Sequence, residues 1–422
     1  MIGRRLLLVL ALVMGAAFAL GPGPARAAPE LPGAPVAVAG AQSASRRVMM
    51  MLDLGAEHYR SGSDYGGDYG DAMGIKARLR FARKVARAHR LALVDSWPMP
   101  LIGVDCIIFE IRDGRTVEAV VRELSAVPGV SWSQPLNEFE MLEARPPGPA
   151  RAATVSYNDR LFSAQPAASL WHLARLHAVA TGRGVTVAVI DSRVDLLHPD
   201  LAGQFAGSVD FVPGRPQAER HGTGVAGIIA ARSNNAQGIA GVAPDARILA
   251  LRACWERATG GVTVCDSLTL ARALTYAIDH GAGVVNLSLT GPRDPLIARL
   301  VALASARGAT VVAAVDQKDP AASFPAFLPG VVAVGDERLS DRLQSAYKAP
   351  GLDVLTTQPE GKWDLVSGSS YAAAHVSGLV ALLRQLSGRR TAPETLLGPH
   401  GTLDACAALA RVSHLDRRAC LR

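Results

Sequence analysis

The chain has few aromatic residues, which make up 5% of its 422 positions, although hydrophobic residues make up 49%. Its core must therefore be built mainly from Ala, Val and Leu, and the chain is too apolar to be disordered. Lys and Arg outnumber Asp and Glu by 44 to 37, which gives a net charge of +7. They form no block and have no aromatic residues interleaved with them, so we expect solvated surface charge and no nucleic-acid partner.

Long apolar runs are missing beyond the first residues. No later segment reaches about 18 uninterrupted apolar residues, the length that a membrane span needs. The apolar stretch at 6–20 follows Arg4 and Arg5 and precedes an A-x-A cleavage site at 25–27, the pattern of a secretory signal. We therefore assign residues 1–27 to a signal peptide. We expect an exported protein, secreted or periplasmic, with no stable membrane span after cleavage; an uncleaved anchor is the alternative.

Cysteine is scarce, with five residues in all. Export permits disulfides, because the receiving compartments are oxidising. Cys254 and Cys265 flank a Gly-containing loop, and Cys406 and Cys420 flank the last turn of chain. Each pair is a predicted bridge, which leaves Cys106 over. Five free thiols are the alternative, since spacing does not settle connectivity.

The rest of the chain divides into two predicted domains. A Pro/Ala-rich linker, 28–46, leads into residues 47–142, whose pattern reads β, α, β, β, α, β and predicts a small ferredoxin-like α+β domain. A second linker, 143–166, precedes the larger domain, 167–412, and a C-terminal tail, 413–422. In the small domain the expected strands are 48–54, 91–95, 105–111 and 130–139, and the expected helices are 72–89 and 117–127.

Strands and helices alternate in the larger domain. This alternation predicts an α/β fold whose central sheet is mostly parallel and covered by helices on both faces. The expected strands are 185–190, 247–253, 283–289, 310–315 and 330–334, and the expected helices are 223–231, 267–280, 295–307 and 370–386.

Three short motifs in this domain supply an Asp, a His and a Ser. Asp191 ends a buried strand, His221 precedes a helix of small apolar residues, and Ser370 opens another helix, at the positive end of its dipole. A serine hydroxyl needs an adjacent base to become a nucleophile, and the base needs a buried carboxylate to orient it. Each residue alone suits a turn, loop or cap, but together they predict a catalytic triad.

The motifs DSRVDLLHPDL, HGTGVAG and GSSYAAAHVSG resemble the Asp, His and Ser motifs of the subtilisin-like serine proteases (subtilases). They occur in that family's order, and the resemblance covers roughly residues 171–409. It implies a three-layer subtilisin-like fold and a serine endopeptidase that cleaves polypeptides through an acyl-enzyme, without a cofactor and as a monomer. It also implies that residues 47–142 form a propeptide that assists folding and inhibits the enzyme, with maturation cleavage at 143–156.

The resemblance extends to the substrate cleft. The segment VVNLSLTGP is similar to the strand that lines one side of the specificity pocket and pairs with substrate, which points to Ser288, Leu289 and Thr290. Gly260 and Gly261 resemble the glycine stretch of the opposite edge. Such edges bind peptides by adding a strand to a sheet.

One departure from the family bears on catalysis. An Asn of the family supplies the side-chain donor of the oxyanion hole, but Asp316, followed by Gln317, stands there in this chain. An ionised carboxylate would repel the oxyanion, and losing such a donor costs on the order of 10² to 10³ in rate. Either Asp316 is protonated and donates, the interpretation we favour, or Gln317 supplies the amide, or the site is impaired.

Further departures leave other functions open. Arg193 replaces a family Gly, so its backbone must avoid conformations that only Gly tolerates, and Tyr371 replaces a Met. Asp200 and Asn235 fall where some subtilases bind calcium, but two oxygen donors are far short of the six to eight that calcium takes. We therefore assign no metal ligands, and a weakly supported structural calcium is the alternative. An inactive subtilase-like binding protein, or an esterase with the same triad, is the alternative function.

Overall fold

The structure is a computed structural model that describes residues 46–54, 69–142, 157–214, 217–257, 262–320, 323–343, 345–387 and 397–413. Contacts divide the chain into residues 1–35 and 36–422, and all described residues belong to the second unit. The expected signal peptide lies outside the described residues. Within the described ranges, no helix is both long enough and apolar enough to cross a membrane.

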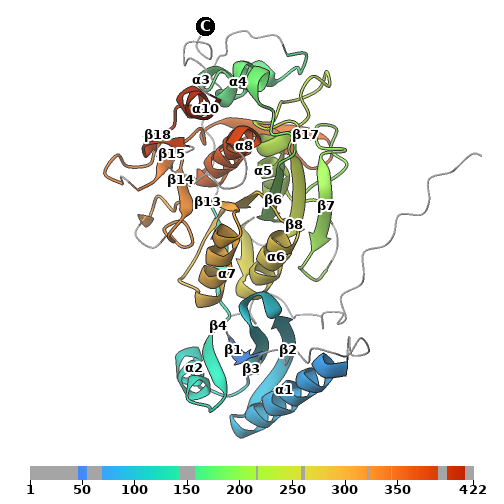
Figure 1. Cartoon of the computed structure of the whole chain (residues 1–422), viewed down its shortest axis with the longest axis vertical. Coiled ribbons are helices and arrows are strands. Elements are labelled where there is room, and N and C mark those ends of the chain that lie inside the picture. The colour runs from blue at the N-terminus through green and yellow to red at the C-terminus, as the bar shows by residue number, and fades with distance from the viewer. Residues whose placement is uncertain are drawn as a thin grey trace, which may run out of the picture. The chain divides into compact units, whose positions relative to one another are not determined.

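Eight strands form the central sheet, in the order β18-β15-β14-β13-β11-β6-β8-β7 (Figure 1). All seven pairings between neighbours are parallel, so the carboxyl ends of the strands share one edge. The strands are β6 (Thr186–Asp191), β7 (Phe205–Asp210), β8 (Arg247–Arg252), β11 (Val284–Leu287), β13 (Thr310–Ala314), β14 (Val331–Gly335), β15 (Tyr347–Lys348) and β18 (Gly401–Thr402).

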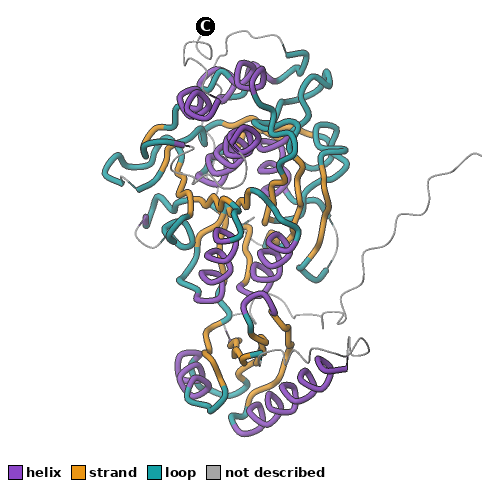
Figure 2. The backbone as a smooth tube through the Cα atoms, in the orientation of Figure 1, coloured by secondary structure: helices purple, strands orange, loops and turns teal. Residues whose placement is uncertain are grey.

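Helices cover both faces of this sheet (Figure 2). In β6, Val187 and Val189 join one apolar cluster with helices α5 and α8, whereas Ala188 and Ile190 join another with α6 and α7. The predicted three-layer fold is confirmed. The helices of this part are α3 (Pro166–Leu170), α4 (Leu173–Val179), α5 (Arg220–Ala230), α6 (Ser267–Asp279), α7 (Pro295–Ala306), α8 (Ser369–Ser387) and α10 (Ala405–Ser413).

The N-terminal subdomain, residues 47–135, has its own four-stranded sheet. The order β2-β3-β1-β4 with antiparallel pairing throughout is the ferredoxin-like topology that the sequence predicts. One face of this sheet packs on the two helices of the subdomain. The elements are β1 (Arg47–Asp53), α1 (Tyr69–Ala88), β2 (Leu91–Met99), β3 (Val104–Ile111), α2 (Val117–Ser125) and β4 (Val130–Pro135).

The strand expected over residues 130–139 is wrong, because the chain changes sheets within it. Strand β4 ends at Pro135, and β5 (Glu138–Met141) pairs with β10 (Thr263–Asp266) and β12 (Leu289–Thr290) of the larger domain. Between them Asn137 is held away from the first sheet. Its carbonyl accepts the N–H of Ser267 at 3.0 Å, and its amide donates to Asp294 at 2.9 Å.

Two further features complete the described fold. Strand β9 (Cys254–Glu256) pairs with β10, and the predicted disulfide between Cys254 and Cys265 joins these neighbours. Strands β16 (Val354–Gln358) and β17 (Lys362–Val366) form a hairpin that leads into α8. The second predicted disulfide involves Cys420, which lies outside the described residues, and Cys106 is a buried free thiol.

Candidate active site

Asp191 is the last residue of β6 and is fully buried. Its Oδ1 atom accepts two hydrogen bonds, from the backbone N–H of Ser192 at 2.7 Å and from Nδ1 of His221 at 2.8 Å. Asp191 therefore lies at the carboxyl end of a parallel strand, which is where α/β proteins bind their ligands.

His221 is the second residue of α5, which begins at Arg220, earlier than the expected residue 223. The following Gly222 explains how its backbone comes so close to the Asp191 turn. A Cβ atom there would lie 2.2 Å from the carbonyl oxygen of Ser192, a distance that no side chain tolerates. With Nδ1–H donating to Asp191, the tautomer of His221 is fixed, and Nε2 is the atom that can accept a proton.

Ser370 is the second residue of α8 and is also fully buried. Its hydroxyl donates to the carbonyl of Ser288 at 2.8 Å, and the Ser288 hydroxyl donates back to the carbonyl of Ser370 at 3.1 Å. Asn286 supports this pair through a 2.9 Å bond to the Ser288 hydroxyl. The next residue, Tyr371, has its ring centroid 5.5 Å from that of His221, so the Ser370 and His221 motifs are neighbours.

The expected substrate-binding strand is occupied by the chain itself. Leu289 and Thr290, which form β12, pair with Met141 and Glu140 of β5. On the other side of β5, Cys265 of β10 lies opposite Phe139. The expected partners Gly260 and Gly261 lie outside the described residues.

The paired segment also contacts Ser370. The backbone N–H of Leu142 donates to Oγ of Ser370 at 3.2 Å. In this arrangement the hydroxyl proton of Ser370 is directed at the carbonyl of Ser288. Sequence reasoning missed β5, although the alternation of Phe139 and Met141 with two glutamates is a typical strand signal.

The two candidate oxyanion donors differ in their contacts. Oδ1 of Asp316 accepts the backbone N–H of Lys318 at 2.8 Å, as in a turn. The amide of Gln317 donates to the hydroxyl of Ser369 at 3.0 Å, next to Ser370. Gln317 also hydrogen-bonds Asp336. Burial raises the pKa of Asp336, but hydrogen bonds from Arg338 and Gln317 outweigh it, and the pKa lies below its ordinary value.

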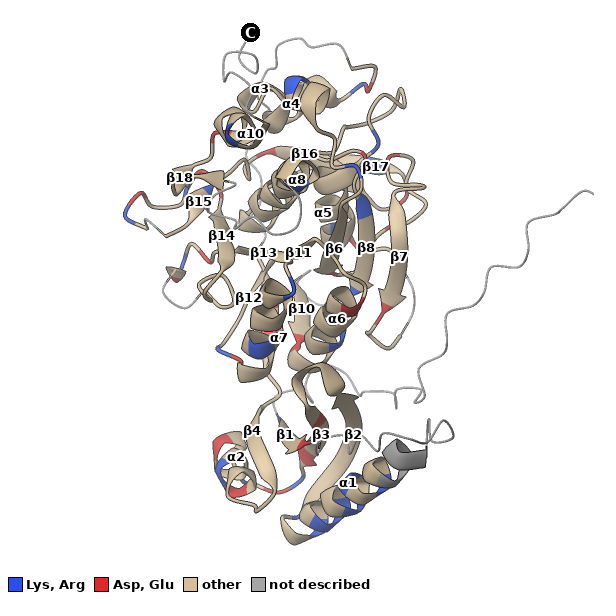
Figure 3. Ribbon diagram, in the orientation of Figure 1, with Lys and Arg blue, Asp and Glu red and all other residues tan. Residues whose placement is uncertain are grey.

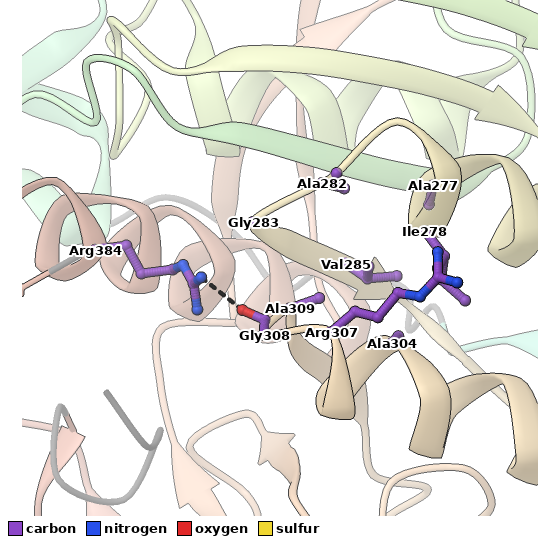
Figure 4. A pocket seen from close by; sticks show the side chains of 11 residues that line it. Ala277, Ile278, Ala282, Gly283, Val285, Ala304, Arg307, Gly308, Ala309 and Arg384 are labelled. Carbon is purple, nitrogen blue, oxygen red and sulfur yellow. Dashed lines mark hydrogen bonds between the residues drawn. The ribbon is translucent and has the colours of Figure 1, made fainter. Parts of the chain in front are cut away.

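Two of the cavities among the described residues lie at opposite ends of β13. One is lined by Thr290, Gly291, Asp316 and Phe324, next to the occupied cleft. The other lies where α6 and α7 end, and Arg384 points into it (Figure 4). Arg384 donates to the carbonyl of Gly308 at 2.6 Å, just beyond the end of α7, and so acts as a structural cap.

The carboxylate of Asp200 does not fit a calcium site. Its Oδ1 accepts an N–H of the Asn235 amide at 2.9 Å. Its Oδ2 accepts the backbone N–H of Ile239 at 2.9 Å and the indole N–H of Trp363 at 2.7 Å. Protein donors therefore take the place that a cation would need, and no cluster of three metal-binding side chains occurs among the described residues.

Charged residues are dispersed over the larger domain, whereas Lys and Arg gather along α1 (Figure 3). Arg193 illustrates the dispersed pattern. It is not among the described residues with positive φ, as expected, and its guanidinium binds Asp210 at 2.8 Å. Arg252 binds the same carboxylate at 3.0 Å.

A buried Asp–His pair beside a helix-borne Ser, all at one edge of a parallel sheet, defines a serine hydrolase of the three-layer α/β class. Comparison with known proteins then gives the family. Residues 182–398 match the model of the subtilase family. The chain belongs to this family and is a serine endopeptidase that acts on polypeptides without a cofactor for its chemistry.

Individual relatives agree with this assignment. A thermophilic serine proteinase of Bacillus sp. (strain AK1) is 36% identical over 288 residues, which are 65% of this chain and 68% of that protein. Thermitase of Thermoactinomyces vulgaris is 37% identical over 218 residues, 49% of this chain and 76% of its own. Fervidolysin of Fervidobacterium pennivorans superposes with a TM-score of 0.66 at 24% identity, over 86% of this chain and 60% of its own, and supports the fold.

Proposed function

We propose that Ser370 is the nucleophile of this endopeptidase, that His221 is its general base and then its general acid, and that Asp191 orients His221. The observation that carries this assignment is the buried 2.8 Å bond between His221 and Asp191, beside the start of α8. In this mechanism Ser370 turns its hydroxyl from Ser288 to Nε2 of His221 and attacks the scissile carbonyl, which forms an acyl-enzyme that water then hydrolyses.

The backbone N–H of Ser370, at the positive end of α8, is the proposed main donor to the oxyanion. For the second donor the contacts favour Gln317 over Asp316. The Gln317 amide already reaches Ser369, and the charged Asp336 holds it there. To donate to the oxyanion, Asp316 would need a proton on Oδ2, because Oδ1 accepts the N–H of Lys318.

We also propose that residues 47–142 are an inhibitory propeptide that assists folding. The pairing of β5 with β10 and β12 is the way in which a polypeptide substrate would bind. The N–H of Leu142 lies 3.2 Å from Ser370 Oγ, and we take the next peptide bond, which follows Leu142, as the scissile bond. Cleavage between Leu142 and Glu143 then separates the two domains, at the start of the predicted linker.

The remaining assignments rest on the sequence. Residues 1–27 are proposed as a signal peptide, so the protein is exported, either to the medium or to a periplasm. A monomer suffices, since one chain carries every proposed catalytic group. The donors around Asp200 support stability without calcium.

Hydrolysis of casein and of a matched peptide ester tests the proposal. The processed protein should cleave both, and Ser370→Ala should cleave neither. Hydrolysis of the ester alone would favour the esterase alternative. Hydrolysis of neither by the processed protein, after separation from residues 47–142, would favour a binding protein.

A further inference from the structure

Methionine is confined to the N-terminal side of the proposed cleavage site. Of the eight methionines, Met1 and Met14 lie in the predicted signal peptide, and the other six are Met49, Met50, Met51, Met73, Met99 and Met141. Residues 143–422 contain none, and Tyr371 follows the nucleophile. The thioether groups that oxidants attack are therefore absent from the catalytic domain.

Three methionines of the N-terminal subdomain lie where it contacts the catalytic domain, and Met141 of β5 lies in the same apolar cluster. Met49 and Met51 alternate with Met50 along β1, and Met99 ends β2. Met49, Met51 and Met99, the interface methionines, are fully buried in the same apolar cluster as residues of α6 and α7 such as Leu296. Met50 faces the other way, into the cluster formed with α1 and α2.

Oxidation of these side chains would change the interface strongly. A peroxide transfers one oxygen atom to the thioether sulfur, so that an S–O bond forms, the O–O bond breaks and the peroxide leaves as water. The sulfur is oxidised and the peroxide is reduced, and the product is a polar sulfoxide. Burying its oxygen in this apolar cluster without a hydrogen-bond donor is unfavourable.

We propose that the N-terminal subdomain is an oxidant-sensitive inhibitor, whose interface methionines, once oxidised by a peroxide, no longer support its binding to the catalytic domain. The proposal rests on the proposed inhibitory role of residues 47–142. The interface methionines are buried while the domains are bound, so oxidation acts on the separated subdomain and prevents its return. The catalytic domain continues to work because it has no methionine.

The experiment uses the full chain after it has processed itself. Hydrogen peroxide is added, sulfoxides are located by mass spectrometry, and the N-terminal fragment is followed by size-exclusion chromatography together with peptidase activity. We expect sulfoxide at the interface methionines and separation of the fragment. Each buried sulfoxide should weaken binding roughly tenfold, with a matching rise in activity.

Three variants control the result. Met49→Leu/Met51→Leu/Met99→Leu keeps apolar side chains of similar volume. It should be inhibited like the parent before oxidation and should lose most of the response. Met50→Leu, on the other face, should keep the response. Cys106→Ala should also keep it, which separates the thioethers from the buried thiol of the same cluster.

Two results would overturn the proposal. One is interface sulfoxide with a fragment that still co-elutes and inhibits, and the other is an equal response in the triple Leu variant. Failure of the proposed function gives a different result: the unoxidised complex would already cleave peptides at the full rate, or the separated catalytic domain would not cleave them at all.

Discussion

The position of the His221 ring is set by contacts outside its own helix. The carboxylate of Asp191 fixes its ring, and Gly222 lets the two chain segments approach. The sequence predicts that Asp191 and His221 come together, because both lie in motifs that resemble those of one family. The contact between Leu142 and the Ser370 hydroxyl could not be predicted, since the two residues are 228 positions apart in the chain.

At the proposed oxyanion site, the contacts of Gln317 and Asp316 predict different effects when each residue is replaced. Gln317→Ala should lower kcat on the order of 10²-fold, because an amide donor beside the nucleophile is lost. Asp316→Asn should change kcat little. Steady-state kinetics on a peptide substrate measures both. A loss confined to Asp316→Asn would instead assign the donor to position 316.

Buried histidines make the fold acid-sensitive. Burial lowers the pKa of His177 to about 4 from its ordinary 6.5. Its Nε2–H donates to the carbonyl of Val242 at 3.0 Å, and the hydroxyl of Tyr157 bonds Nδ1 at 2.5 Å. Between these pH values the unfolded chain binds more protons, so the free energy of unfolding falls as pH drops from 6.5 to 4, by up to about 1.4 kcal/mol per pH unit.

The change to test is His177→Gln in a Ser370→Ala background, which prevents autolysis. The amide can still donate to Val242 but does not titrate. Urea unfolding at several pH values should show a smaller slope in this variant, while Ser370→Ala alone keeps the full slope. Equal slopes would contradict the assignment.

Among the elements, long strands and helices of the larger domain were the most predictable. The continuous apolar run of β6 and the small-residue helix α8 have unmistakable patterns, and their expected bounds differ from the observed ones by one residue. The break between β4 and β5 was not predictable. It depends on Asn137 contacting Asp294, a partner 157 residues away, which no local pattern encodes.

Trp363 joins the hairpin β16–β17 to Asp200, in the loop between β6 and β7. Trp363→Phe should reduce the free energy of unfolding by about 1–3 kcal/mol, because the buried carboxylate of Asp200 loses an N–H donor while the ring packing on His198 remains. Thermal unfolding in the Ser370→Ala background measures this. Unchanged stability would contradict the role of the indole N–H.

Chelation tests the same site without a mutation. Excess EDTA should leave the Tm of the Ser370→Ala chain unchanged, because protein donors satisfy Asp200. Added calcium should not raise it. A fall of several degrees with EDTA, restored by calcium, would show that a cation supports the described fold.

At the scale of the whole molecule, strand β5 of the chain pairs with the strands expected to bind substrate. The sequence predicts a propeptide domain by resemblance, but not which residues meet Ser370, because that depends on the register of β5 against β12. N-terminal sequencing of the mature protein should begin at Glu143. A start well inside residues 144–156 would show that β5 does not mark the scissile bond.

The affinity of the N-terminal subdomain for the catalytic domain can be measured separately. Asp294 caps α7 and accepts amide N–H groups from Gln134 and Asn137, each at 2.9 Å. Asn137→Ala should weaken inhibition by about tenfold, since hydrogen bonds to charged groups are the stronger ones. An inhibition constant equal to that of the parent would contradict this.

The most direct test of the triad is labelling with a serine-directed fluorophosphonate probe. The processed protein, separated from residues 47–142, should take up one label, at Ser370, and Ser370→Ala should take up none. His221→Ala should label far more slowly. Absence of label from the separated catalytic domain, or labelling that persists in Ser370→Ala, would contradict the account.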